Sequence, residues 1–330
     1  MQKKITMADI AKLSGVGKST ISRYFNGGYV KQETRERIQR VIGEYDYEPN
    51  AFARLNAKAS NVIGVVVPTL NSKIAGRVTT SIDRYLRSRD YTTLIKNSDH
   101  DVELEILNMK RLMGMKVDGI LLSAISITQE HRELIQQAEI PIVVLAQEYE
   151  DGISVVDDDY RAGLLMGEYV GKQGFERVAY IGAMEWDRAV GVERKQGVLE
   201  GLSRCQIADP VVIHTGFSFE EGYAAAKQLY ESGMPEAVIC ATDRLAYGLY
   251  QFLGEKGLQV PEDVSVAGFG GYQESSLLRP PLTTLKFDSY GLGYLGAETL
   301  LKMIKGEPVP KKQVVDFSFL LGESVRGKRT

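Results

Sequence analysis

Residues 7–26, MADIAKLSGVGKSTISRYFN, restrict the fold more than any other stretch of the chain. Apolar residues recur there at the spacing of two short helices, and Gly15 stands at the turn between them, where a positive φ angle costs glycine little. A small residue, Ala11, falls where the two helices would cross. The shared core is expected to hold Ile10, Val16, Ile21 and Tyr24. This pattern predicts a helix-turn-helix.

The second helix of this unit, residues 18–25, carries many hydrogen-bond donors. They are Lys18, Ser19, Thr20, Ser22 and Arg23. Such side chains bind base edges and phosphates, and the second helix of a helix-turn-helix lies in the DNA major groove. A third amphipathic helix over 33–45 completes the unit. We therefore predict a DNA-binding domain in residues 1–50, with double-stranded DNA as its partner.

Two other interpretations of the same residues are weaker. The letters GKST at 17–20 resemble the end of a phosphate-binding P-loop, but that loop needs a glycine where Lys12 stands and a buried strand before it. The residues before the turn are helical in pattern instead. An ordinary pair of surface helices is the other alternative.

Charge and composition divide the chain in the same way. Residues 1–60 carry a net charge of +5 within a chain of net charge −3, so a basic head precedes an acidic body. The N-terminus has no apolar segment of the secretory kind, and no apolar run is long enough to span a membrane. Cys205 and Cys240 have neither metal-site nor disulfide-framework spacing, which indicates a cytoplasmic protein without a metal or other cofactor.

From residue 61 onward, strand-like and helix-like segments alternate, beginning with the β-branched run 62–67. Such alternation predicts parallel sheets with helical crossovers, and ten strands suit two α/β lobes. The other strands are expected at 92–96, 119–123, 142–146, 154–156, 178–182, 211–214, 237–241, 264–268 and 284–286, with helices at 78–89, 104–115, 161–173, 193–204, 219–232 and 244–256. Residues 51–60 form a hinge helix or linker between head and body.

Ligands of such sheets bind beyond the carboxyl ends of the strands, so two facing lobes would enclose a cleft. The strand ends offer hydroxyls, amides, carboxylates and aromatic rings, a mixture that suits sugars. The candidate residues at these ends are Asn71, Ser72, Gln147, Trp186, Asp187, Phe217, Thr242, Asp243 and Tyr272. No catalytic constellation accompanies them, so we predict a binding protein and not an enzyme. The run Asp157–Asp159 is expected to form a solvated loop or the start of a helix, although a metal cluster is the alternative.

Across its whole length the chain resembles the lac-repressor family of bacterial transcription regulators. The segments that carry the resemblance are ITMADIAKLSGVGKSTISRYFN, YEPNAFA, NVIGVVVP, VDGILL, GVERKQGVLEGL, ICATDRLAYGL, PEDVSVAGFGG and RPPLTTLKFDSYGLG. The resemblance implies a dimer that binds a pseudo-palindromic operator. It also implies a body like the periplasmic sugar-binding proteins, with an N-lobe of about 61–159 and 290–316 and a C-lobe of about 160–289 and 317–330.

The resemblance also implies roles for single residues on the DNA side. Lys18 and Ser19 match the family's principal base-reading pair, and Arg23 matches another base contact. Thr6, Thr20, Ser22 and Asn26 match phosphate-contacting positions. In the hinge, Ala53, Leu55 and Asn56 are the minor-groove candidates. Many members have a leucine where Asn56 stands, so either Leu55 takes that role or the hinge helix is rotated.

On the effector side, Arg194 matches the family's ligand-binding arginine in an R-x-x-G pattern, and Asp243 matches the polar residue after a strand in ATDRLA. Gly270 stands where galactoside-type members carry an acid, which argues against a galactoside ligand. The GFGG segment with AVGVERKQG is most similar to the sucrose-operon repressors. We therefore expect a repressor of a sugar-utilisation operon, controlled by a sugar or sugar phosphate of the sucrose or fructose type.

Alternative functions are a cytosolic sugar-binding protein, a sugar enzyme without a regulatory role, and a regulator for another carbohydrate such as trehalose phosphate. The helix-turn-helix argues against the first, and the missing catalytic constellation argues against the second. Residues 322–330 contain no leucine heptads, the element that forms a C-terminal coiled coil in the family's tetramers, so a homodimer is expected.

Overall fold

The structure is a computed structural model that describes residues 5–25, 28–47 and 60–327. By its contacts the chain divides into two units, Met1–Ser60 and Asn61–Thr330. The predicted hinge at 51–60 and the candidate DNA contacts Asn26, Ala53, Leu55 and Asn56 lie outside the described residues, apart from Ser60.

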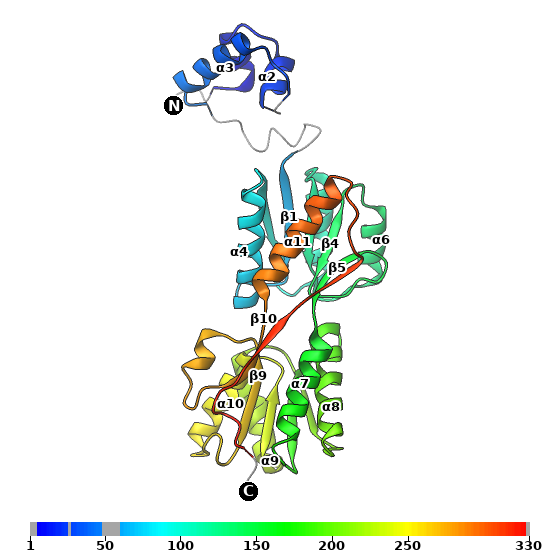
Figure 1. Ribbon diagram of the computed structural model, residues 1–330, viewed down its shortest axis with the longest axis vertical. Helices are drawn as coiled ribbons and strands as arrows, with labels where there is room; N and C mark the ends of the chain where they lie inside the picture. The colour runs from blue at the N-terminus through cyan, green and yellow to red at the C-terminus, as the bar shows by residue number, and fades with distance from the viewer. Residues whose placement is uncertain (1–4, 26–27, 48–59, 328–330) are drawn as a thin grey trace. The chain divides into compact units, whose positions relative to one another are not determined.

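The described residues of the first unit form the helices α1 (Met7–Leu13), α2 (Lys18–Phe25) and α3 (Gln32–Glu44) (Figure 1). Gly15 has the positive φ angle that the turn requires, at 67°. Ala11 is buried between the helices, as its size predicted. The core consists of Ile10, Ala11, Ile21, Val30, Ile38 and Tyr47, with Val16 and Tyr24 packed against it. The predicted helix-turn-helix core is therefore present.

The second unit contains two six-stranded sheets (Figure 1). The N-lobe sheet is parallel throughout and has the order β11-β5-β4-β3-β1-β2. Its strands are β1 (Val62–Val67), β2 (Thr92–Asn97), β3 (Gly119–Ser123), β4 (Ile142–Leu145), β5 (Ile153–Asp157) and β11 (Lys312–Val315). Every residue of β1 is buried, which explains why all its residues except Gly64 are valine or isoleucine.

The C-lobe sheet has the order β12-β10-β9-β8-β6-β7 and is parallel except for the edge pair β10 and β12. Its strands are β6 (Val178–Ala183), β7 (Val211–Thr215), β8 (Ala237–Cys240), β9 (Ser265–Phe269), β10 (Thr283–Phe287) and β12 (Phe317–Leu320). The chain passes between the two sheets three times, after β5, after β10 and after β11. A backbone hydrogen bond of 3.2 Å from the Asp288 N–H to the Asp316 carbonyl joins the last two crossings.

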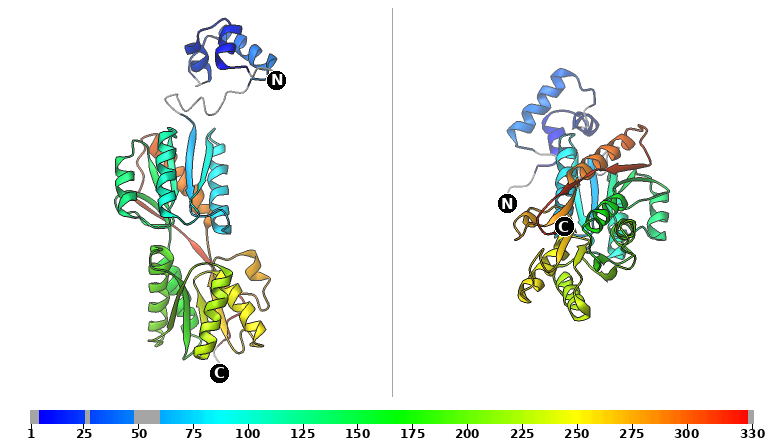
Figure 2. Two further views of the ribbon diagram at one scale, coloured as in Figure 1. Left: turned by 180° about the vertical axis from the view of Figure 1, so that it is seen from behind. Right: turned by 60° about the horizontal axis from the view of Figure 1, so that its bottom comes forward.

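Helices cover both sheets (Figure 2). The N-lobe has α4 (Lys73–Arg87), α5 (Val102–Gly114), α6 (Gln129–Gln137) and α11 (Ser289–Ile304). The C-lobe has α7 (Asp159–Gly171), α8 (Lys195–Arg204), α9 (Phe219–Gly233) and α10 (Asp243–Glu255), with a π-helix η2 (Arg188–Arg194) and a 3₁₀ turn η3 (Gln273–Ser276). In the described part of the chain, no helix combines the length and apolarity needed to cross a membrane.

Some expected elements needed correction. The strands β11 and β12 were not predicted, because each has only four residues, and their alternating exposure gives no buried apolar run. β12 also runs antiparallel to its neighbour, which corrects the expectation of purely parallel sheets. The helix predicted over 193–204 is preceded by the π-helix η2, so its helical segment begins at Arg188. The helices α6 and α11 were not predicted.

Helices α7 and α8 approach closely because glycines line their contact. A methyl group on Gly197 would lie 2.1 Å from the carbonyl oxygen of Tyr160, and one on Gly163 would lie 2.2 Å from that of Arg194. No side chain can occupy these positions without separating the helices. This close approach brings the start of α7 beside the end of η2, where Asp159 and Arg194 lie.

We predict that Gly197→Ala destabilises the second unit by about 1–3 kcal/mol, the usual cost of overpacking a well-filled contact. The matched control is Gly254→Ala on α10, because nothing lies within 4 Å of a methyl group there. It should leave stability unchanged or raise it. Thermal unfolding followed by circular dichroism checks both variants, and equal melting temperatures would contradict the steric argument.

Candidate DNA-binding and effector-binding sites

The polar residues of α2 lie on the side away from its core. Ile21 is fully buried and anchors the helix, whereas Lys18, Ser19 and Arg23 are exposed. Thr20 and Ser22 are half-buried. The exposed side chains can therefore reach a nucleic acid without unfolding the head, as direct readout requires.

Thr6 has a structural role at the start of α1. Its hydroxyl donates to Asp9 Oδ2 at 2.6 Å and accepts from the Asp9 N–H at 3.3 Å, and the Thr6 N–H donates back to the carboxylate at 2.9 Å. Thr6 is therefore the N-cap of α1, and it forms a capping box with Asp9. The phosphate contact that the resemblance implies for Thr6 stays a prediction.

In the second unit, Arg194 is the centre of a buried polar cluster. Its Nε and Nη2 donate to Asp159 Oδ1 at 2.8 and 2.5 Å, and its Nη1 donates to the carbonyl oxygen of Ala241 at 2.7 Å. The rings of Phe269 and Phe287 lie 5.0 and 4.8 Å from the guanidinium carbon. Burial lowers the pKa of Arg194 but Asp159 raises it, with a net shift upward. The cluster joins η2, α7 and the end of β8.

Asp157 and Asp158, the other members of the acidic run, have different environments. Asp158 caps α7 by accepting from the Arg161 N–H at 3.2 Å, as a helix start predicted. Asp157 is at the first crossing between the sheets, and its Oδ1 is buried without a hydrogen-bond partner. Burial, and then repulsion from Asp159, raise the pKa of Asp157 to about 7. Within the described residues, no three His, Cys, Asp or Glu side chains form a metal-binding group.

Asp243 is completely buried at the first position of α10, and Thr242 caps the helix instead of Asp243. Asp243 Oδ2 accepts from Ser275 Oγ at 2.6 Å and from the Tyr272 N–H at 3.2 Å, while Oδ1 accepts from Thr284 Oγ1 at 2.6 Å. Burial raises the pKa of Asp243, and these donors lower it in part. Asp243 thus orders the loop after β9.

Gln147 links the two lobes at the end of β4. Its Nε2 donates to Asp187 Oδ1 at 2.9 Å and to the carbonyl oxygen of Ile125 at 3.3 Å, and its Oε1 accepts from the Ala189 N–H at 3.3 Å. Asp187 also caps η2 by accepting from the Val190 N–H at 3.0 Å. The structure therefore brings together two predicted effector residues, one from each lobe.

Sequence reasoning missed a second connection between the lobes. Lys73, in the first turn of α4, forms an ion pair with Glu274 in η3. One turn later on α4, the Arg77 guanidinium lies 6.0 Å from the centre of the Tyr272 ring. Lys73 and Arg77 are basic residues four positions apart at the start of a helix that follows the end of a strand. This spacing is the signal that could have identified them as contacts to the other lobe.

The remaining predicted effector residues are Asn71, Ser72, Trp186 and Phe217. Asn71 is exposed in the loop before α4, which Ser72 caps by accepting from the Ala75 N–H at 3.4 Å. Trp186 is 49% exposed between β6 and η2, and Phe217 is half-buried before α9. Their roles, like those of the other site residues, stay predictions.

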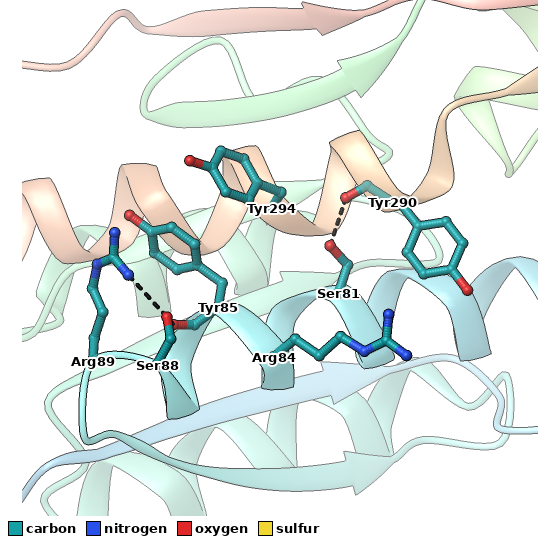
Figure 3. A pocket seen from close by; sticks show the side chains of 7 residues that line it. All are labelled: Ser81, Arg84, Tyr85, Ser88, Arg89, Tyr290 and Tyr294. Carbon is teal, nitrogen blue, oxygen red and sulfur yellow. Dashed lines mark hydrogen bonds between the residues drawn. The ribbon is translucent and has the colours of Figure 1, made fainter.

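A separate surface pocket of about 360 Å³ lies between α4 and α11 (Figure 3). Tyrosine, arginine and serine side chains line it, and Ser81 Oγ donates to the Tyr290 carbonyl oxygen at 2.6 Å across the two helices. The lining residues are Ser81, Arg84, Tyr85, Ser88, Arg89, Tyr290 and Tyr294. None of the predicted effector residues is among them.

A helix-turn-helix unit followed by two parallel-sheet lobes, with polar side chains between the lobes, defines a DNA-binding regulator that carries a ligand-binding body. The comparisons with known proteins support this class. Residues 6–50 match bacterial regulatory proteins of the lacI family, and residues 168–325 match a periplasmic binding protein-like domain. The chain belongs to the lacI family, as its sequence resemblance predicted.

Two relatives illustrate the match. A sucrose operon repressor of Staphylococcus xylosus is 31% identical over 94% of this chain and 97% of the relative. Catabolite control protein A of Staphylococcus aureus is 29% identical over 94% of this chain and 96% of the relative. The protein is therefore a DNA-binding transcriptional repressor of this family and not an enzyme, which confirms both predictions.

Solved structures confirm the fold. A lac repressor dimer bound to operator and the anti-inducer ONPF has a TM-score of 0.87 at 25% identity, covering 98% of this chain and 99% of that one. A complex of the transcriptional regulator CelR with cellobiose has a TM-score of 0.75 at 25% identity, covering 97% and 99%. The predicted α/β architecture with a helix-turn-helix head is thus confirmed.

We predict that Lys18→Ala changes which bases are preferred in the operator, because a direct base contact contributes about 1–3 kcal/mol of discrimination. The matched control is Lys12→Ala on α1, whose exposed side chain was not predicted to read bases. In a selection from random DNA, it should keep the wild-type preference. Identical preferred sequences for wild type and Lys18→Ala would contradict the base-reading role.

Because Asp159 is buried, its pairing with Arg194 leads to a prediction about stability. Arg194→Met should destabilise the protein by about 3–5 kcal/mol, because it leaves a buried carboxylate without its partner. The double variant Arg194→Met with Asp159→Leu should recover most of this loss. Thermal unfolding of the single and double variants checks the pair, and a double variant as unstable as Arg194→Met would show that the pairing is not the cause.

The raised pKa of Asp157 predicts a dependence of stability on pH. The folded protein holds this proton more tightly than the unfolded chain, so stability should fall as pH rises from the usual value of 3.8 to about 7. Asp157→Asn should therefore raise the melting temperature at pH 8 by at least about 2 °C relative to wild type. The gain should vanish at pH 4, and a gain of the same size at both pH values would exclude titration as its origin.

Proposed function

We propose that this protein represses a sugar-utilisation operon in the cytoplasm. It binds a pseudo-palindromic operator as a homodimer, and a sugar or sugar phosphate of the sucrose or fructose type sets its affinity for DNA. The observation that carries the proposal is the similarity to a sucrose operon repressor over 97% of that relative's length. The structure of a lac repressor dimer on its operator supports the dimeric, DNA-bound form.

The proposed domain organisation follows the division of the chain into two units. Residues 1–50 bind DNA, residues 51–60 form the hinge, and residues 61–330 bind the effector and dimerise. Within the body, 61–159 with 290–316 form the N-lobe, and 160–289 with 317–330 form the C-lobe. In the head, Lys18, Ser19 and Arg23 read bases. The phosphate contacts are Thr6, Thr20, Ser22 and Asn26, and the hinge contacts are Ala53, Leu55 and Asn56.

The effector binds between the lobes. Gln147 and Asp187 offer an amide and a carboxylate to sugar hydroxyls once their mutual hydrogen bond of 2.9 Å is exchanged for contacts with the ligand. Trp186 and Phe217 can cover an apolar face of a sugar ring. The remaining cleft residues are Asn71, Ser72, Arg194, Thr242, Asp243 and Tyr272. Because both Arg194 and Asp243 are buried, they position the cleft wall and the loop after β9.

Regulation requires that the effector distinguish two arrangements of the lobes, since a ligand with equal affinity for both shifts nothing. The Gln147 and Lys73 contacts hold the lobes together in one arrangement. An effector that replaces these contacts can stabilise another. The lobe movement would then change the spacing of the two hinges in the dimer, and so the fit of the heads to the operator.

Operator footprinting with and without candidate sugars tests the proposal. The protein should protect a pseudo-palindromic site, and at least one sugar or sugar phosphate should change the protein concentration required for protection. A fragment that begins at Asn61 should lose DNA binding and keep sugar binding. Protection by this fragment, or a footprint that no sugar changes, would contradict the proposed division of roles.

We further predict that Gln147→Ala alters the sugar response without altering the operator sequence that is recognised. Gln147 bridges the lobes and lies in the body, so its loss removes three hydrogen bonds to Ile125, Asp187 and Ala189. The matched control is Gln136→Ala on α6. The sugar concentration for half-maximal response should shift by about tenfold, the effect of about 1.4 kcal/mol. A shift of the same size in the Gln136 variant would exclude a role for the bridge.

A further inference from the structure

We propose that the effector carries a phosphate group and that Arg77 of α4 and Arg244 of α10, one from each lobe, bind that phosphate beside Tyr272. This inference rests on the proposed function, because it names the ligand class of the same cleft. The sequence leaves a neutral sugar and a sugar phosphate both open. The charged side chains around Tyr272 favour the sugar phosphate over the neutral sugar.

Tyr272 contacts residues near the N-termini of both α4 and α10. Its N–H donates to Asp243 Oδ2 at 3.2 Å, which holds it against the first turn of α10, where Arg244 follows. On its other side, the ring lies 6.0 Å from the guanidinium of Arg77 on α4. Arg77 and Arg244 therefore belong to one neighbourhood, although 167 positions separate them in the sequence.

The helix starts themselves favour an anion. α4 has 15 residues and α10 has 13, and both begin beside this segment, with Ser72 and Thr242 as their caps. The N-terminus of a helix carries a partial positive charge and N–H groups that lack partners within the helix. Two such ends add to the charge of the two arginines.

The cations of this region differ in how they are neutralised. Lys73 is paired with Glu274, and Arg194 is paired with Asp159. Among the described residues, Arg77 and Arg244 form no ion pair with a carboxylate. The Nη1 atom of Arg77 is moreover buried without a hydrogen-bond partner, a costly state for a charged donor that an acceptor oxygen of a ligand would remove.

Tyr272 supplies a neutral donor at the same place. Burial, and then Asp243, raise the pKa of the Tyr272 hydroxyl to about 12, although Arg194, Arg77 and Arg244 act in the opposite direction. The hydroxyl therefore keeps its proton at neutral pH and can donate to a phosphate oxygen.

Two carboxylates border the adjacent loop. Asp243 accepts hydrogen bonds from Ser275, Thr284 and the Tyr272 N–H, and Glu274 pairs with Lys73, although Glu274 Oε2 is buried without a hydrogen-bond partner. The loop itself adds no further carboxylate at its first two positions. Residues 270 and 271 are both glycine, with φ angles of +142° and +57°. A methyl group on Gly271 would lie 2.3 Å from Lys286 Cβ, and one on Gly270 would lie 3.2 Å from the Tyr272 ring. The loop is thus shaped for glycine at both positions.

Matched pairs of ligands test the inference on the full-length protein. Isothermal titration compares fructose with fructose 6-phosphate, glucose with glucose 6-phosphate, and sucrose with sucrose 6-phosphate. In at least one pair, the phosphorylated member should bind at least about tenfold more tightly, because two charge-assisted contacts are added. Inorganic phosphate alone is the additional probe, and it should give neither this affinity nor a change in the operator footprint.

Arg77→Gln and Arg244→Gln should each reduce the preference for the phosphorylated member to below about threefold, while the affinity for the parent sugar changes by less than about twofold. The control is Arg84→Gln, since Arg84 is an exposed arginine of α4 without a carboxylate partner and lies in the separate pocket of Figure 3. It should keep the full preference. Melting temperatures within 2 °C of wild type establish that the variants are folded (about 1 kcal/mol or less).

Three results would overturn the inference. They are parent sugars that bind as tightly as their phosphates, a preference that survives in both arginine variants, and inorganic phosphate that reproduces the full effect. In the first two cases a neutral sugar that still changes the footprint leaves the proposed function intact. A footprint that responds to no sugar, phosphorylated or not, contradicts the proposed function together with this inference.

Discussion

The ion pair between Arg194 and Asp159 is the interaction on which the C-lobe and the cleft depend. It is buried between two phenylalanine rings and also reaches the carbonyl oxygen of Ala241, so it joins η2, α7 and the end of β8. Removing one partner of a buried ion pair destabilises the folded protein more than replacing both partners with apolar residues. Glycines between α7 and α8 allow the close approach that places Asp159 beside Arg194.

Much of the fold follows from the sequence because its signals are local. The turn at Gly15, the buried Ala11 and the β-branched run 62–67 each depend on a few neighbouring residues, and each occurs as predicted. The strands β11 and β12 could not be recognised in this way. Their order comes from pairing with β5 and β10, which are more than 25 positions distant, and their own residues are mixed in polarity.

In the candidate site, too, local sequence signals identified residue types but not the contacts between distant residues. Residue types and strand ends pointed to Gln147 and Asp187, yet no local pattern could show that these two side chains bond to each other across the lobes. The ligand contact expected of Arg194 stays a prediction. Its hydrogen bonds to Asp159 and Ala241 result from helix packing that the sequence does not encode locally. The Lys73 and Arg77 contacts were missed for the same reason.

The central claim is that a ligand in the cleft and the operator bind to different arrangements of one protein. Linkage then requires a reciprocal effect: the factor by which effector changes operator affinity must equal the factor by which operator changes effector affinity. Isothermal titration of the effector into free protein and into operator-bound protein measures this directly. The account predicts two different dissociation constants whose ratio matches the change in operator affinity. Equal constants in the two titrations would contradict it.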